Sequence, residues 1–173
     1  MFSSIFKLSK KEDRHLSLAV LIGIITGILS AFVKSGTESI LPPRTLDRIA
    51  PPVKMIEDMG VNINNFVYTY SDQVVHWGGN GVHIIFSIAV AIFYCLASEI
   101  FPRIKIFQGL AFAIVVMVAF HGIVLPILNL SPAVWNLPFD ELFSEVIGTL
   151  LWMWSIELLR MNLRYRMTKK ADL

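Results

Sequence analysis

Four apolar stretches, each about as long as a bilayer-spanning helix, constrain this chain more than any other feature. They occupy residues 16–33, 82–101, 107–128 and 142–159. An α-helix needs about 20 apolar residues to cross roughly 30 Å of hydrocarbon. The chain is also 55% hydrophobic and only 16% charged, whereas soluble domains are about a quarter charged. The sequence therefore predicts an all-α polytopic membrane protein: one integral membrane domain over residues 1–173 with four transmembrane helices.

The first apolar stretch follows a group of basic residues, as the apolar region of a signal peptide does. They are Lys7, Lys10, Lys11 and Arg14. The stretch is longer than the 7–15 residues typical of such a region. No small-x-small cleavage pattern follows it, because Leu29 stands where a small residue is needed before Ala31. We therefore interpret this stretch as an uncleaved transmembrane helix.

Basic residues concentrate on one side of the four predicted spans. Of the 15 Lys and Arg residues, eleven lie before the first span, between the second and third, or after the fourth. Cytoplasmic segments of membrane proteins carry such an excess. Both termini are therefore predicted to be cytoplasmic, and residues 34–81 are predicted to form a loop on the outer side, which is the periplasm if the membrane is a bacterial inner membrane. This topology explains the basic residues without a nucleic-acid partner.

The first loop is too long to be structureless by default. The proline pair at 51–52 suits the first turn of a short helix, which we predict to continue through residues 53–59. A large apolar side chain then recurs every fourth residue, at Phe66, Tyr70 and Val74. This spacing predicts an amphipathic helix lying on the outer surface. The sequence HWGGNG at 76–81 predicts a break in the chain before the second span.

Small residues recur at intervals of four in two of the spans. They are Gly23, Gly27 and Ala31 in the first span, and Ser144 and Gly148 in the fourth. Small residues let helix backbones approach closely in lipid, so each row predicts a helix interface, either within one subunit or between copies. A four-helix unit of this size rarely encloses a pathway by itself, which favours a homo-oligomer. The single cysteine, Cys95, is interpreted as a packing residue.

The predicted topology sorts the ionisable residues near the membrane into two layers. The outer layer gathers Lys34, Glu38, His83, His121 and Glu145. The inner layer is predicted to pair Glu99 and Glu157 with Arg160, Arg103 or Lys105. Glu157 and Arg160 are three residues apart on one predicted helix and can meet there. The alternative is that these carboxylates extend to the nearby interface and have no further role.

A polar seam is predicted along the second span, where four polar side chains fall on one helical face. They are His83, Ser87, Tyr94 and Ser98. His121 lies about 10 Å inside the third span at 1.5 Å per residue, and intramembrane ionisable residues usually face the bundle interior. We therefore predict that His83 lies within reach of His121 or Glu145, directly or through water, with Ser87 continuing the path. The structural alternative for His83 is a hydrogen bond to a carbonyl at the interface.

Four segments carry a combination of residues that is distinctive as a set. They are SAFVKSGTESILPPR (30–44), GVHIIFSIAVAIFYCLASEIFPRIKIFQG (81–109), LPFDELFSEVIGTLLWMWSIELLR (137–160) and the segment from His121 to Pro126. These segments resemble the YagU-like family of bacterial inner-membrane proteins, in order across all four spans. The resemblance implies an inner-membrane location, an undetermined molecular function and a loose link to survival in acid. It brings no established catalytic or binding residues.

Three kinds of function are compatible with this pattern. The first is a pH-responsive or proton-linked channel or transporter for a small solute or ion. Unperturbed histidine has a pKa of about 6.5, so acidification outside would charge the histidines of the outer layer. The second is a non-catalytic structural, lipid-binding or partner-binding membrane component. The third is an intramembrane enzyme with His83, His121 and Glu145 as metal ligands. These three residues lie on separate spans without a local metal-binding spacing, so no enzyme activity, metal or other cofactor is predicted.

Overall fold

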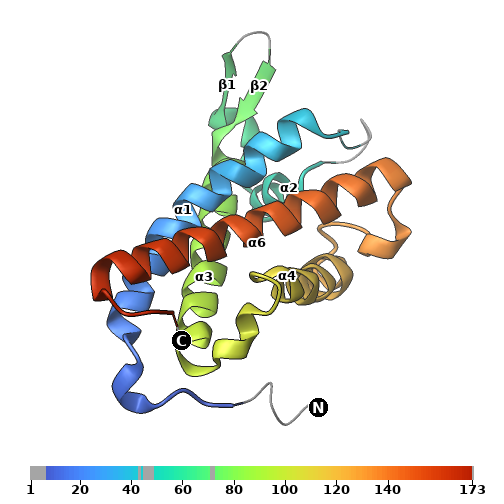
Figure 1. The fold of residues 1–173 in the computed structure, drawn as a ribbon. Coiled ribbons are helices and arrows are strands. Elements are labelled where there is room, and N and C mark those ends of the chain that lie inside the picture. The colour runs from blue at the N-terminus through green and yellow to red at the C-terminus, as the bar shows by residue number, and fades with distance from the viewer. Residues whose placement is uncertain (1–6, 43, 45–48, 71–72, 173) are drawn as a thin grey trace.

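The computed structural model describes residues 7–42, 44, 49–70 and 73–172. In this part of the chain four helical spans are long and apolar enough to cross a membrane (Figure 1), as predicted. The first, second and fourth spans are the single helices α1 (Leu16–Ile40), α3 (Trp77–Ile100) and α6 (Phe139–Thr168). The third span consists of three consecutive segments: α4 (Leu110–Met117), a π-helical segment (Val118–Val124) and α5 (Leu125–Ile127). Short 3₁₀ turns lie at Lys11–Asp13, Ile63–Phe66, Pro102–Lys105 and Val134–Asn136.

Helix α1 extends beyond the apolar stretch that predicted it. Lys34 and Glu38, which the sequence pattern places after the span, lie inside its last turns. A helix does not stop where its apolar residues stop, because charged side chains four residues apart can support further turns. The Lys34 Nζ and Glu38 Oε1 atoms are 3.0 Å apart. The correction places both groups on a rigid helix rather than in the loop.

Helix α1 packs along α3 through its row of small residues. A Cβ added to Gly23 would lie 2.5 Å from the Cα of Ile92, and one added to Gly27 would lie 2.5 Å from the Cα of Ile88. Non-bonded carbon atoms do not approach so closely, so only glycine permits this contact. The row predicted from the sequence is therefore an interface within one subunit. Helix α6 packs on α1 as well, and α4 packs on α6.

Ser87 joins three helices at the centre of this packing. Its fully buried hydroxyl donates to the Gly27 carbonyl oxygen on α1 at 2.7 Å. The Trp152 Nε1 group on α6 donates to the same hydroxyl oxygen at 2.8 Å. Ser30 on α1 lies 3.2 Å away, Oγ to Oγ. This hydrogen-bonded group ties α1, α3 and α6 together in surroundings where water cannot compete.

Between Ser87 and the end of the bundle that carries both termini, the interior is mainly apolar and closely packed. The cluster at its centre consists of Val90, Ala91, Tyr94, Ala113, Val116, Trp152, Met153 and Ile156, from α3, α4 and α6. The side chains of Ala91, Met153 and Ile156 have no accessible surface. The predicted polar seam is therefore interrupted here. Ser98 does not continue it, because its hydroxyl donates to the Cys95 carbonyl oxygen of its own helix at 2.8 Å.

The first loop contains the predicted short helix but not the predicted second one. Helix α2 (Pro51–Asp58) begins at the proline pair, as expected. The amphipathic helix predicted from Phe66, Tyr70 and Val74 is wrong. Strands β1 (Val67–Tyr70) and β2 (Gln73–His76) form an antiparallel hairpin there, with Val67 opposite His76. The segment is rich in β-branched and aromatic residues, which fit a strand better than a helix, and a stripe of three residues does not outweigh that preference.

The predicted chain break at 76–81 is also wrong, because α3 begins at Trp77 and runs through the glycines. A Cβ on Gly78 would lie 2.9 Å from the Cβ of Phe66, and one on Gly79 would lie 2.7 Å from Cγ2 of Val53. Glycine in a helix costs about 1 kcal/mol relative to alanine. Close packing of α2 and of the Ile63–Phe66 turn against the first turn of α3 offsets that cost. These glycines therefore seat the first loop on the bundle.

Both termini of the described chain lie at one end of the bundle. The backbone N–H of Ser9 donates to the Ile100 carbonyl oxygen at 3.0 Å, and Arg164 donates to the carbonyl oxygens of Asp13 and Ala171. The hairpin projects at the other end (Figure 1). This arrangement requires the termini to share one side of the membrane, and the charge distribution predicts that this side is the cytoplasm.

Labelling of single cysteines from outside intact cells tests that orientation. We expect cysteines replacing Lys10 and Lys170 to react only after the membrane is permeabilised. A cysteine replacing Tyr68, which is 54% exposed on β1, is the matched control and should react directly. The buried native Cys95 should contribute little background. Direct labelling at positions 10 and 170, with protection at position 68, would contradict the prediction and place both termini outside the cytoplasm.

Candidate functional site

An ionic cluster lies where α1, the first loop, the third span and α6 meet, and we call it the loop-side cluster. Glu145 on α6 is its centre. The Arg44 guanidinium lies 2.6 Å from Glu145 Oε1, and Lys34 Nζ lies 3.4 Å from Oε2. His121 Nδ1 lies 3.7 Å from the same Oε2. Glu38 completes the cluster by pairing with Lys34 at 3.0 Å and with Arg44 at 3.8 Å.

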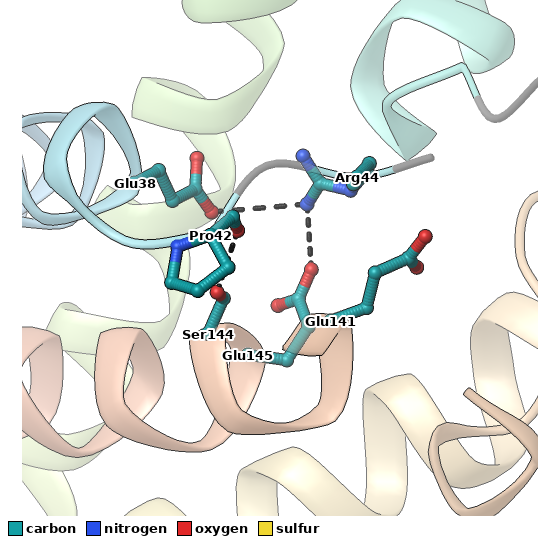
Figure 2. A pocket seen from close by; sticks show the side chains of 6 residues that line it. All are labelled: Glu38, Pro42, Arg44, Glu141, Ser144 and Glu145. Carbon is teal, nitrogen blue, oxygen red and sulfur yellow. Dashed lines mark hydrogen bonds and ion pairs between the residues drawn. The ribbon is translucent and has the colours of Figure 1, made fainter. Parts of the chain in front are cut away.

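The burial of Glu145 explains why so many cations surround it. Its side chain is only 9% exposed, and a buried carboxylate without partners would cost several kcal/mol of desolvation. Ser144 beside it donates to the Pro42 carbonyl oxygen at 2.7 Å, which holds the start of the first loop against α6. Figure 2 shows Arg44 reaching from this loop toward Glu38 and Glu145. Burial lowers the pKa of Arg44, but Glu145 and Glu38 outweigh it and raise the pKa above its ordinary value.

His121 enters the cluster from the π-helical segment of the third span. There the N–H of Leu125 donates to the Phe120 carbonyl, five residues back, instead of four. Gly122 accommodates Trp135, whose Cζ3 would lie 2.5 Å from an added Cβ. The backbone hydrogen bonding of residues 118–124 is thus of the π type. Such π segments occur frequently at functional sites.

A cavity of about 420 Å³ opens beside the loop-side cluster. It lies between α3 and the third span, and residues of α1, α6 and the first loop, including residues 50–53, complete its lining. The charged and titratable residues in its wall are Lys34, Glu38, Arg44, His83, His121 and Glu145. Much of the remaining wall is apolar and includes Phe86, Val116, Phe120, Leu125 and Trp152. A smaller pocket of about 140 Å³ shares some of these residues and is lined by Glu38, Pro42, Arg44, Glu141, Ser144 and Glu145 (Figure 2).

The structure therefore gathers all five residues of the predicted outer layer around one site. Lys34, Glu38, His121 and Glu145 make direct ionic contacts. His83 lies in the wall of the same cavity, but within the described residues it makes no hydrogen bond or ion pair, so the predicted contact with His121 or Glu145 is not a direct one. Ser87 does not continue a path from His83, because its hydroxyl proton is donated to Gly27.

A second ionic cluster lies at the end of the bundle that carries both termini, and we call it the terminal cluster. Arg160 binds Glu157 through two nitrogens, at 2.6 and 2.9 Å, as predicted for this pair. The predicted partners of Glu99 are corrected, because Arg164 binds it at 2.5 Å. Arg164 follows Arg160 by one turn on the same face of α6, and Arg160 is already occupied. The backbone N–H of His15 also donates to Glu99, at 2.9 Å.

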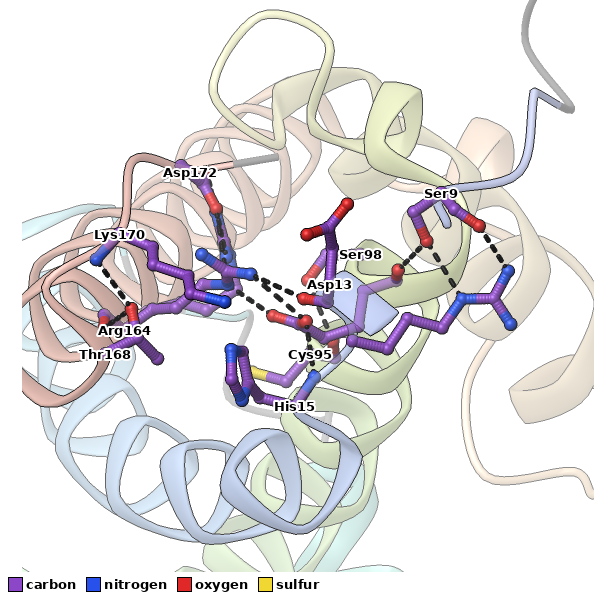
Figure 3. A network of polar contacts seen from close by, with 12 residues as sticks. Ser9, Asp13, His15, Cys95, Ser98, Arg164, Thr168, Lys170 and Asp172 are labelled. Atoms are coloured by element: carbon purple, nitrogen blue, oxygen red, sulfur yellow. Dashed lines mark hydrogen bonds and ion pairs between the residues drawn. The ribbon is translucent and has the colours of Figure 1, made fainter. Parts of the chain in front are cut away.

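The C-terminal segment closes this cluster. Asp172 lies 2.5 Å from Arg160 and 2.8 Å from Lys105, which occupies the turn with Arg103 after α3. Burial raises the pKa of Asp172, but Arg160 and Lys105 outweigh it and lower the pKa to about 2. Burial lowers the pKa of Lys105 despite Asp172. Figure 3 shows Arg164 beside Asp172 and pointing toward the segment that carries Asp13 and His15. These contacts fix both terminal segments to the helix ends.

Sequence reasoning missed three of the charged residues in these clusters. Arg44 and Asp172 lie in irregular segments, where helical spacing gives no indication of a contact. Arg164 carried a usable signal, because Glu157, Arg160 and Arg164 share one helical face. Within the described residues, no group of three or more His, Cys, Asp or Glu side chains is arranged to hold a metal ion. The clusters consist of acid–base pairs instead.

The fold and its two clusters define a class: a four-span helical membrane protein with buried ionic groups near each end of the bundle. The chain belongs to a family of proteins of unknown function, DUF1440, which it matches over residues 28–158. It is 38% identical to the inner membrane protein YagU of Escherichia coli (strain K12) over 195 aligned positions, covering 98% of this chain and 95% of that protein. The resemblance noted in the sequence is thereby confirmed. No solved structure matches the chain.

Proposed function

We propose that this protein is a non-enzymatic, pH-responsive membrane transporter, in which proton uptake at the loop-side cluster is linked to binding of a small solute in the adjoining cavity. Acting in the bacterial inner membrane, it would contribute to acid tolerance. The observation that carries the proposal is that His83 and His121 line one cavity together with the fixed charges of Lys34, Arg44, Glu38 and Glu145.

The charge balance of the site supports a response to acid. Lys34 and Arg44 balance Glu38 and Glu145 when both histidines are neutral. Glu141, which lines the smaller pocket, adds one further carboxylate. Protonation of both histidines on acidification would add two positive charges facing the cavity. A site whose charge changes sign on acidification can bind and release a charged solute with pH.

The closed centre of the bundle favours a carrier over an open pore. Ala91, Tyr94, Met153 and Ile156 fill the interior between the two clusters. One subunit with this packing offers no continuous water path through the described residues, so movement of solute requires the helices to rearrange. A homo-oligomer remains our prediction and is tested by the mass of the purified complex.

Proton entry into proteoliposomes tests the transporter proposal. With a pH-sensitive dye inside the vesicles, an acid step outside should lower internal pH faster with protein than without it. His83→Gln and His121→Gln should each reduce that rate severalfold. His76→Gln on β2, which lies outside the cavity lining, is the matched control and should leave the rate unchanged. Equal rates with and without protein, across several added solutes, would overturn the proposal.

The second candidate is a non-catalytic structural or lipid-binding membrane component. The hydrogen-bonded joint of Gly27, Ser87 and Trp152 favours it, because a rigid three-helix core suits a scaffold better than a moving carrier. A folded protein that retains tightly bound lipid and moves neither protons nor solutes would support this candidate instead.

A further inference from the structure

The wall of the cavity beside the loop-side cluster combines charged and apolar side chains. The cations Lys34 and Arg44, the histidines His83 and His121 and the carboxylates Glu38 and Glu145 line it, and the rest of the wall is mainly apolar and reaches Val116 and Trp152. Val116 lies five residues before His121 on the third span, which is about 7.5 Å along a helix. A volume of about 420 Å³ is within the usual range for small-ligand sites. The shape therefore provides a polar site for a headgroup and an apolar site for a chain.

We propose that the cavity binds a single-chain anionic amphiphile, with its charged head at Lys34, Arg44, His83 and His121 and its apolar chain between α3 and the third span. This inference rests on the proposed function for the role of the cavity and adds the chemical class of the ligand. A carboxylate and a phosphate ester share the required chemistry, and the experiment below distinguishes them.

Entry from the bilayer follows from how the helices pack. Residues 79–86 of α3 and residues 116–128, which include most of the third span, contribute much of the lining, so the cavity lies between these two spans. Ile85 on α3 lines the cavity and is also 70% exposed at the surface of the bundle. In a membrane that surface faces acyl chains. A ligand with an apolar chain can therefore approach sideways from the lipid.

The preference for an anion follows from which charges already have partners. Glu145 has Lys34, Arg44 and His121 around it, and Glu38 has Lys34 and Arg44. Glu141 on α6 faces the smaller pocket. His83 has no carboxylate paired with it within the described part of the chain. A proton taken up by His83 therefore creates a cation that has no direct ion pair, and an anionic headgroup in the cavity can form one.

Quenching of Trp152 fluorescence by brominated ligands tests the proposal. The protein is placed in nanodiscs of zwitterionic lipid, and a bromoalkyl sulfate, whose head is charged at every pH used, is added. We expect the half-saturating ligand concentration to be at least about fivefold lower at pH 5.5 than at pH 8, because protonation of the histidines in the wall adds positive charge near the head. A bromoalkyl trimethylammonium of equal length should quench far less. Trp152→Phe should remove the saturable component, whereas Trp154→Phe should keep it.

Variants of the head site make the outcome decisive. Arg44→Gln and His83→Gln should each weaken half-saturation severalfold, and His83→Gln should also reduce its pH dependence; Lys54→Gln on α2 is the matched control. Competition by dodecanoate but not by lysophosphatidylglycerol assigns a free fatty acid, and the reverse assigns a lipid phosphate. Equal quenching by the sulfate and the ammonium ligands overturns the proposal. Ligand binding without proton flux would refute the proposed transporter function but not the proposed binding of an amphiphile. Proton flux without quenching would refute the binding of an amphiphile but not the transporter function.

Discussion

Replacing Arg164 by leucine should destabilise the protein by about 3–5 kcal/mol, because it leaves a buried carboxylate without its cation. Glu99 and Arg164 have side chains that are 4% and 2% exposed, and their closest atoms are 2.5 Å apart. Arg164 also donates to the Asp13 and Ala171 carbonyl oxygens. The substitution therefore releases both terminal segments as well as the ion pair. Unfolding of the detergent-solubilised protein by denaturant, followed by circular dichroism, measures the loss.

Two further variants distinguish the stability lost with the buried ion pair from the stability lost with an exposed ion pair on a helix. Lys54→Met breaks the exposed i,i+4 pair with Asp58 on α2 and should cost less than about 1 kcal/mol. The double variant Glu99→Met with Arg164→Leu should recover part of the loss, because replacing a whole buried pair by apolar groups is often nearly neutral. If Arg164→Leu costs no more than Lys54→Met, the terminal cluster does not stabilise the fold.

The spans and the residues of the loop-side cluster could be predicted because membrane insertion imposes strong rules. A helix must satisfy its own backbone in lipid, so apolar length alone located all four spans. Buried ionisable groups are costly there and collect in the bundle interior, so depth alone brought Lys34, His121 and Glu145 together. These rules concern the environment of a residue and need no knowledge of its partners.

The errors arose where tertiary packing determines the local structure. The segment predicted to be a helix from Phe66, Tyr70 and Val74 forms a hairpin. The glycines at 78 and 79, predicted to break the chain before the second span, lie in the first turn of α3. Close contacts with Phe66 and Val53 decide the second case, and no local pattern shows them. Arg44 was missed as a partner of Glu145 for the same reason, since Ser144 holds its loop through the Pro42 carbonyl oxygen.

The distribution of packing relates these features to function. Helices α1, α3 and α6 are tied together at Gly27, Ser87 and Trp152, whereas the cavity lies between α3 and the third span near the loop-side cluster. His121 lies on that third span, at a π-helical segment. A proton or ligand bound there acts on the least buried of the four spans. The rigid joint and the cavity therefore divide the bundle into a fixed part and a part able to respond.

Replacing Gly27 by leucine should disrupt the fixed part. The first added carbon would lie 2.5 Å from the Cα of Ile88 and 3.0 Å from the Ser87 carbonyl oxygen. Both atoms belong to the backbone of α3 and cannot rotate away, so the helices must separate and the Ser87 hydrogen bond to Gly27 is lost. Overpacking of this kind costs about 1–3 kcal/mol and occasionally more, and loss of the buried hydrogen bond adds about 1 kcal/mol.

Gly36 provides a control on the same helix with the opposite expected sign. No atom lies within 4 Å of a Cβ added there, so Gly36→Leu should gain up to about 1 kcal/mol from helix propensity. Denaturant unfolding in detergent should therefore move the two variants in opposite directions from the parent protein. Trp152 fluorescence should also change in Gly27→Leu alone, because its indole donates to Ser87. Equal stability of the two variants would mean that α1 and α3 do not pack through this row, and the joint between the fixed helices would have to lie elsewhere.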